Sequence, residues 1–143
     1  MPSEEQVSIS KLRLDIAKER LSYADEILKI GDYKTVANRS YYAVFSAMRA
    51  VLALNGFDSK KHSGIIAELR RLYLKTEILP KELSEIIDSL VEVRQGSDYD
   101  DFYIASKEES ERQISVADEF MILAEKYCLE QLEKQKEDQI SMI

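Results

Sequence analysis

The sequence predicts an all-α protein, folded as an antiparallel up-and-down bundle of four to five helices. The chain of 143 residues has only four glycines and two prolines, whereas sheets and hairpins normally need more of these turn residues. Apolar residues recur along it at alternating spacings of three and four, which is the period of an amphipathic helix. The links between these stripes are short, so successive helices are expected to pack antiparallel.

The first helix is predicted over about 9–30. Ser8 or Ser10 can cap its start, and Gly31 follows its end, where a residue in the left-handed conformation is usually glycine. Its apolar stripe is Leu14, Ala17, Leu21, Ala24 and Leu28.

The second helix is predicted over about 33–55, with Asp32 as its N-cap and Asn55-Gly56 as its end. Two apolar stripes run along it, so we expect it at the centre of the bundle. The remaining face is polar and aromatic rather than a Glu/Lys mixture, which indicates that something docks there. That face carries Asn38, Arg39, Tyr42, Ser46 and Arg49.

Two shorter helices follow. One is predicted over about 61–75, and the next starts with Pro80 in its first turn and is interrupted at Gly96. The apolar stripe of this fourth helix is followed, at the same spacing, by Arg94, so an arginine occupies a position that faces the core.

The last helix is predicted to open at a capping box of Ser106 and Glu109. Its stripe includes Cys128, which we expect to be a small core residue, and ends at Leu132. Beyond that residue the apolar period is lost, so 133–143 is predicted to be a frayed tail. The sequence thus predicts one domain over 1–143, with an ordered bundle over about 8–132.

Composition excludes several function classes. A net charge of −7 and a pI near 4.9 argue against binding of duplex DNA through the global field, although the third helix is locally basic. One cysteine and one histidine, His62, do not make a zinc or di-iron site, so no metal or cofactor is expected. No apolar run approaches the roughly 18 residues of a membrane span, and we expect a cytoplasmic protein with no membrane contact.

Arg94 has two interpretations. A buried guanidinium needs a partner, and either it contacts phosphate or RNA in a dimer cleft, or it forms a structural ion pair with Asp98, Asp100 or Asp101. The polar side chains of the second helix can likewise line that cleft or form a hydrogen-bond network at a subunit interface. These side chains are Asn38, Arg39, Tyr42 and Arg49.

Three motifs carry a resemblance to a known family. The string ANRSYYAVF at 37–45 is followed by KHSG at 61–64 and by Arg94, Asp98 and Tyr99 in the late segment RQGSDY. In this order they resemble the HEPN family of small helical-bundle proteins, and more narrowly its prokaryotic branch with NRxYYAxF and RxxxDY motifs. The match covers most of the chain.

The resemblance implies a homodimer, often encoded beside a nucleotidyltransferase-like protein and in many relatives acting as a toxin. Active relatives are metal-independent endoribonucleases with an Arg followed four to six residues later by a His. Arg94 matches the arginine, but Tyr99, Asp100 and Asp101 stand where the histidine is expected. Tyrosine, with an unperturbed pKa of about 10, is a poor base. His62 can replace the missing group only if folding brings it to Arg94.

In some relatives the partner adenylylates a tyrosine near the catalytic histidine. The aligned residue here is Asp101, flanked by Tyr99 and Tyr103, either of which can substitute. The predicted function is therefore a dimeric partner module of a nucleotidyltransferase, of toxin–antitoxin or nucleotide-sensing type, without full ribonuclease activity. The alternatives are a ribonuclease toxin that uses Arg94 with Tyr99 or His62, and a purely structural dimerisation module. RNA or a nucleotide is an expected ligand under the first two.

Overall fold

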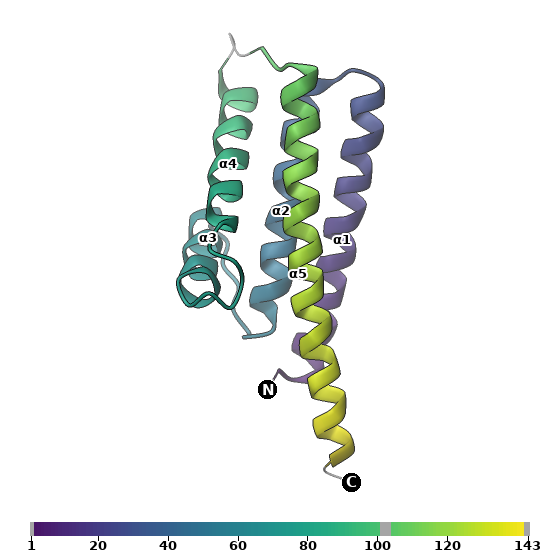
Figure 1. The fold of residues 1–143 in the computed structure, drawn as a ribbon, viewed down its shortest axis with the longest axis vertical. Coiled ribbons are helices and arrows are strands. Elements are labelled where there is room, and N and C mark those ends of the chain that lie inside the picture. The colour runs from purple at the N-terminus through teal and green to yellow at the C-terminus, as the bar shows by residue number, and fades with distance from the viewer. Residues whose placement is uncertain (1, 101–103, 142–143) are drawn as a thin grey trace.

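The computed structural model describes residues 2–100 and 104–141, and in these ranges it contains helices and no strand. The four long helices alternate in direction along one axis, as Figure 1 shows, which confirms the predicted all-α bundle. A π-helical segment, η1, directly continues the short third helix. The elements are α1 (Glu4–Lys29), α2 (Tyr33–Ala53), α3 (His62–Leu69), η1 (Arg70–Leu74), α4 (Leu83–Tyr99) and α5 (Lys107–Ser141).

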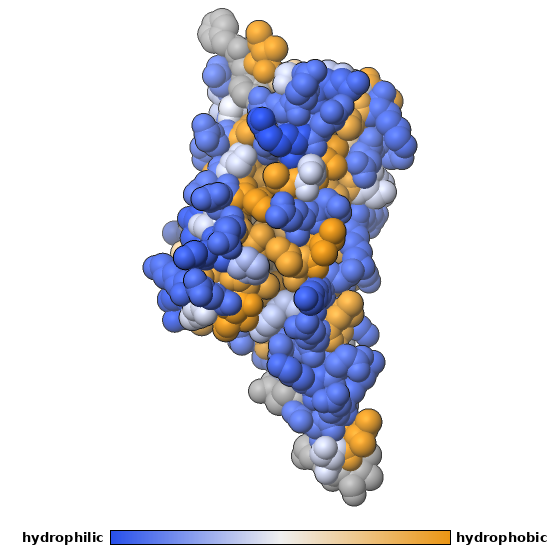
Figure 2. Space-filling view, in the orientation of Figure 1, coloured by the Kyte–Doolittle hydropathy of each residue, from blue (hydrophilic) through white to orange (hydrophobic). Residues whose placement is uncertain are grey.

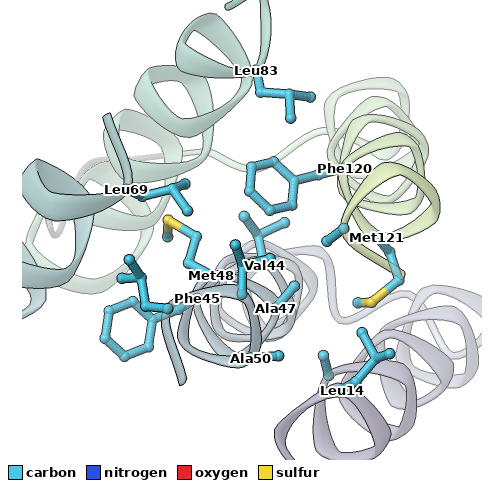
Figure 3. Packing of buried hydrophobic residues seen from close by; sticks show 14 of the residues in the cluster. Leu14, Val44, Phe45, Ala47, Met48, Ala50, Leu69, Leu83, Phe120 and Met121 are labelled. Carbon is cyan, nitrogen blue, oxygen red and sulfur yellow. The ribbon is translucent and has the colours of Figure 1, made fainter. Parts of the chain in front are cut away.

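Helix α2 lies at the centre of the bundle, as its two apolar stripes predict. It contributes more buried residues than any other helix, and it packs against α1, α4, α5 and α3. Figure 3 shows Val44 and Met48 of α2 surrounded by Leu69 of α3, Leu83 of α4 and Phe120 of α5. The chain thus holds one continuous core, with Cys128 as the small buried residue expected.

The helix ends are mostly as expected. Asp32 caps α2 by accepting from the backbone N–H of Thr35, and Gly31 has a φ of 81°, which favours glycine. Helix α1 starts earlier than predicted, because Ser3 and Gln6 form a reciprocal capping box.

Helices α3 and α4 differ from the prediction in detail. The helix expected over 61–75 widens into η1, where the Lys75 N–H reaches back to the Arg70 carbonyl. Helix α4 begins at Leu83 rather than at Pro80, after a turn in which the Leu83 N–H donates to the Pro80 carbonyl. Gly96 does not interrupt α4. The helix continues to Tyr99: a glycine in a helix costs only about 1 kcal/mol, and this turn packs on the bundle with Ser97 buried.

The C-terminal segment is helical where a frayed tail was predicted. Helix α5 begins after Ser106, whose Oγ accepts from the Glu109 N–H, and runs to Ser141. Its far end gains partners from the N-terminus: the buried Gln135 donates to the Pro2 carbonyl at 2.9 Å, and Gln139 donates to Glu4. Figure 1 shows this end of α5 extending past the bundle.

The surface seen in Figure 2 is mainly hydrophilic at the outer helices, with hydrophobic side chains gathered over the middle of α5 and its border with α4. None of the helices that the structure describes is both long and apolar enough to cross a membrane.

Candidate functional site

Arg94 lies in the penultimate turn of α4, on the side that packs against α2. Its Nη2 donates to the Tyr42 hydroxyl at 3.2 Å, and its Nε lies 3.3 Å from Oδ2 of Asp98, one turn further along α4. The Nε–H does not point at the carboxylate, so the second contact is an ion pair without a hydrogen bond. The Arg94 side chain is only 17% exposed. Of the two interpretations of this residue, the described residues show the intramolecular ion pair with Asp98.

Aromatic rings enclose the same guanidinium. Its carbon lies 4.8 Å from the ring centroid of Tyr41, 5.3 Å from that of Tyr42 and 5.9 Å from that of Tyr99. Cation–π contacts of this kind suit Arg, because its planar group is weakly hydrated and stacks on ring faces. The Arg94 charge is thus satisfied within the chain, by one carboxylate and three rings.

His62 joins this cluster from the first turn of α3. The loop after α2 returns α3 alongside that helix, so that the His62 ring stacks on Phe45 with centroids 4.1 Å apart. Its Nδ1 shares a hydrogen bond of 2.9 Å with the hydroxyl of Tyr41, the residue whose ring underlies Arg94. Burial, followed by the positive charges of Arg94 and Arg49, lowers the pKa of His62 from its ordinary value of 6.5. The neutral imidazole is therefore favoured, and a neutral imidazole can accept a proton.

Asn38 extends the cluster along α2. Its Nδ2 donates to Oδ2 of Asp98 at 3.2 Å, while its Oδ1 accepts from Nη1 of the exposed Arg39 at 3.5 Å. One carboxylate therefore serves both Arg94 and Asn38, which ties the end of α4 to the start of α2.

Arg49 belongs to a different group. Its guanidinium forms two hydrogen bonds, of 3.2 and 2.9 Å, with the Asp58 carboxylate, which also pairs with Arg13 at 3.0 Å. The hydrogen bond from Arg49 lowers the pKa of Asp58 most, so this carboxylate stays charged. These contacts fix the loop after α2 and thereby position His62, but Arg49 contacts none of the Arg94 cluster in the part of the chain that the structure describes.

Tyr99 is the accessible member of the cluster, with 73% of its surface exposed. It lies beside Arg94 at the last position of α4. Tyr103, the other tyrosine proposed for modification, lies outside the described residues, as does Asp101.

The structure adds one arginine that the sequence interpretation missed. Arg20 of α1 donates from Nη1 to Ser46 Oγ at 2.5 Å, and its guanidinium carbon lies 5.9 Å from the Tyr42 ring. Tyr42 is thus flanked by Arg20 and Arg94. The available signal was the position of Arg20, seven residues after Arg13 and so on the same side of α1.

Within residues 2–100 and 104–141, no group of His, Cys, Asp and Glu side chains is arranged to hold a metal ion.

A scan against protein-family models matches residues 10–127 to the HEPN domain. The chain belongs to the HEPN family. A relative from Thermotoga maritima, named UPF0332 protein, is 33% identical over 77% of this chain and 83% of its own length. Two relatives from Methanocaldococcus jannaschii are each named "Putative toxin"; they are 28% identical over 81% and 60% of this chain, and over 79% and 64% of their own lengths.

In this HEPN domain the three sequence motifs meet at one place. The NRxYYAxF motif supplies Asn38, Tyr41 and Tyr42, the KHSG motif supplies His62, and the RxxxDY motif supplies Arg94 with Asp98 and Tyr99. Folding therefore brings His62 into the cluster that contains Arg94.

Proposed function

We propose that this chain is the HEPN subunit of a toxin–antitoxin or nucleotide-sensing pair, that it acts as a homodimer with a nucleotidyltransferase-like partner, and that it lacks full ribonuclease activity. The observation that carries the proposal is the state of Arg94. Its charge is paired with Asp98 and enclosed by tyrosine rings, so it is poorly placed to meet a phosphate. The names of the M. jannaschii relatives support the toxin context.

The exposed Tyr99 offers the partner a target. In an adenylyl transfer, the phenolic oxygen of Tyr99 attacks the α-phosphorus of ATP and the bond from that phosphorus to pyrophosphate breaks. The phenolic proton passes to a base of the nucleotidyltransferase, and pyrophosphate leaves. The Arg94 guanidinium lies 5.9 Å from the centroid of the Tyr99 ring and so holds this side chain at the end of α4.

The partner role predicts a nucleotidyltransferase-like protein encoded beside this chain, and co-expression of the two proteins tests it. We expect a stable complex, or a protein heavier by one adenylyl group that Tyr99→Phe no longer receives. Tyr23→Phe is the matched control, because Tyr23 is also an exposed tyrosine but lies on α1. Separate migration together with an unmodified mass would contradict the proposal, whereas loss of the modification in Tyr103→Phe instead of Tyr99→Phe would move the target. Light scattering at micromolar concentration is expected to show a dimer.

The position of His62 supports a second candidate, a metal-independent ribonuclease. When His62 carries its proton on Nδ1 it donates to Tyr41, and Nε2 is free to take the proton of an RNA 2′-hydroxyl. The 2′-oxygen then attacks the phosphorus, and the leaving 5′-oxygen takes a proton from an acid, for which the Tyr99 phenol is available. The product is a 2′,3′-cyclic phosphate.

Cleavage of mixed cellular RNA in EDTA separates the two candidates. The ribonuclease hypothesis predicts activity that both Arg94→Ala and His62→Gln abolish, with circular dichroism showing that each variant is folded. Arg71→Gln is the matched control, because Arg71 pairs with Glu68 on the exposed side of α3 and η1. No cleavage by the folded wild-type protein would contradict the ribonuclease hypothesis, and co-expression with the partner then separates the partner role from a purely structural dimerisation module.

A further inference from the structure

A second surface feature includes Arg20, which like Arg94 lies near the Tyr42 ring. Helices α1 and α2 form a hollow of about 430 Å³ there, which the proposed function does not use. We call it the α1–α2 hollow. Its lining residues are Arg20, Tyr23, Glu26, Ile27 and Arg39.

The two arginines of the α1–α2 hollow differ from most others of the chain in having no carboxylate partner among residues 2–100 and 104–141. Arg20 donates to the Ser46 hydroxyl, and Arg39 reaches only the side-chain oxygen of Asn38, at 3.5 Å. By contrast, Arg94 is paired with Asp98 and Arg49 with Asp58.

The one acid of the hollow does not cancel this charge. Glu26 pairs with Lys29 at 3.2 Å, so its carboxylate already has a cation beside it. Two guanidinium groups with free donors therefore face one concave surface on a protein whose net charge is −7. Such an arrangement attracts an anion locally, against the sign of the whole molecule.

The guanidinium groups and the tyrosine ring of the α1–α2 hollow favour a ligand in which a phosphate is attached to a planar group. The planar guanidinium presents paired donors that match phosphate oxygens. Tyr23 supplies a ring that is 52% exposed and whose hydroxyl is fixed by donation to Glu19 at 2.7 Å, and an exposed ring of this kind is a stacking surface for a nucleobase.

We propose that the α1–α2 hollow binds the phosphate of a nucleotide, either free or within single-stranded RNA, through Arg20 and Arg39, with its base against Tyr23. The hollow adjoins the Arg94 cluster, since Arg20 and Arg94 both lie over the Tyr42 ring, at 5.9 and 5.3 Å. A strand bound there would lead toward that cluster. This inference rests on the nucleotide-sensing form of the proposed function and deepens it by naming a binding site, and its test is separate because binding needs neither the partner protein nor cleavage.

Binding of ATP and of a labelled single-stranded RNA to the purified chain, each in EDTA at several salt concentrations, tests the proposal. For RNA, the logarithm of affinity falls with the logarithm of salt concentration with a slope of about −0.7 per phosphate contact. Arg20→Gln and Arg39→Gln should therefore each weaken binding and make this slope shallower by about 0.7. Arg39 is exposed, so its variant is expected to fold even if replacement of Arg20 disturbs the packing.

Two controls sharpen the test. Arg71→Gln removes the same charge from an exposed, carboxylate-paired site and should leave the slope unchanged. Tyr23→Ala should weaken binding at every salt concentration without changing the slope, because the contact that it removes carries no charge.

The two ligands distinguish a free nucleotide from an RNA strand. Binding of ATP alone identifies the ligand as a free nucleotide, and binding of RNA alone identifies it as a strand. Binding of neither overturns the proposal, as does binding whose slope is the same in wild type, Arg20→Gln and Arg39→Gln. Because only this chain is used, failure of the nucleotidyltransferase complex leaves the result interpretable.

Discussion

At the scale of single residues, Arg94 shows how an ion pair, one hydrogen bond and aromatic rings together accommodate a side chain that is costly to bury, although its Nε–H makes no hydrogen bond among the described residues. An unpaired guanidinium removed from water would destabilise the fold, and here Asp98, Tyr42 and the neighbouring rings offset that loss. The ion pair spans one helical turn, so it was among the options visible in the sequence. The rings of Tyr41 and Tyr42 come from α2, and their contact with Arg94 depends on how the two helices pack.

Arg94→Lys keeps the charge but not the planar group. We expect it to lower the free energy of unfolding by about 1–2 kcal/mol, because a lysine cannot maintain the Tyr42 hydrogen bond together with the stacking on Tyr41. Urea denaturation measures this loss, and the dependence of the free energy of unfolding on urea concentration should be the same in the variant and the wild type. Arg112→Lys, at an exposed position of α5, should change stability by less than about 0.5 kcal/mol. Equal effects of the two substitutions would show that the cluster contributes nothing specific.

The lowered pKa of His62 predicts how the stability of the fold depends on pH. Its pKa is lowered in the folded state, so below its unfolded value of 6.5 the unfolded chain binds more protons than the folded one. The contribution of His62 is therefore present above pH 6.5 and is lost as the pH falls from there through the folded pKa.

Since His62 is the single histidine, His62→Gln should remove this dependence. We expect the stability difference between wild type and His62→Gln to shrink between pH 7 and pH 5.5, measured by urea denaturation across that range. A difference that stays constant would show that the ring titrates in the folded protein as it does in the unfolded chain.

The residues of the site were predictable to different degrees. Asp98 follows from its spacing to Arg94, and Tyr42 from the polar face of the second helix. The approach of His62 to Arg94 depends on the course of the loop after α2, which the Arg13–Asp58–Arg49 contacts fix and no local pattern specifies. Arg20 was missed because an arginine on the polar side of a helix looks like a solvated residue until its neighbours are known.

At the scale of elements, the apolar period located every helix, and the differences lie at the ends. A repeated apolar pattern predicts the interior of a helix, whereas the residue at which a helix begins or ends depends on single contacts. Ser3 rather than Ser8 or Ser10 caps α1: its Oγ accepts from the Gln6 N–H, and its own N–H donates to the Gln6 side chain. The end of α5 is helical because Gln135 contacts Pro2 at the other end of the chain. The apolar period of a sequence does not predict a contact between such distant residues.

Truncation tests that explanation for α5. A chain ending at Glu137 keeps the Gln135 contact with Pro2 and should unfold with nearly the wild-type free energy. A chain ending at Lys134 loses it, and we expect a decrease of about 1 kcal/mol, because the Pro2 carbonyl loses its partner and Gln135 no longer covers the start of α1. Gln135→Ala in the full chain should reproduce most of this decrease. Equal stability of the two truncated chains, measured by urea denaturation, would mean that the Gln135 contact with Pro2 contributes nothing.

At the scale of the whole molecule, the helices pack against one another to different extents, and the candidate site lies where α3 and α4, the helices outside the larger core, meet α2. Helix α1 packs against α2 and α5, and these three form the larger part of the core. Helix α4 packs chiefly against α2 and little against α5, and only Leu83, Ile87, Leu90 and Ser97 of it are buried. Figure 1 shows α3 and α4 together on one side of the three long helices. Separation of α4 from α2 would take apart the Arg94 contacts with Tyr41 and Tyr42.

Local opening of α3 and α4 should therefore precede global unfolding. Amide hydrogen exchange is expected to show lower protection in α4 than in α2, because opening α4 exposes less buried apolar surface. Val7→Ala on α1 distinguishes local opening of α4 from global unfolding. It removes two methylene equivalents, about 0.8 kcal/mol each, from a part of the core that stays packed when α4 opens. Protection in α2 should then fall while protection in α4 does not. If α2 and α4 instead exchange with one free energy in the wild type, the bundle opens as a single unit, and the contacts of Arg94 with Tyr41 and Tyr42 then separate only on complete unfolding.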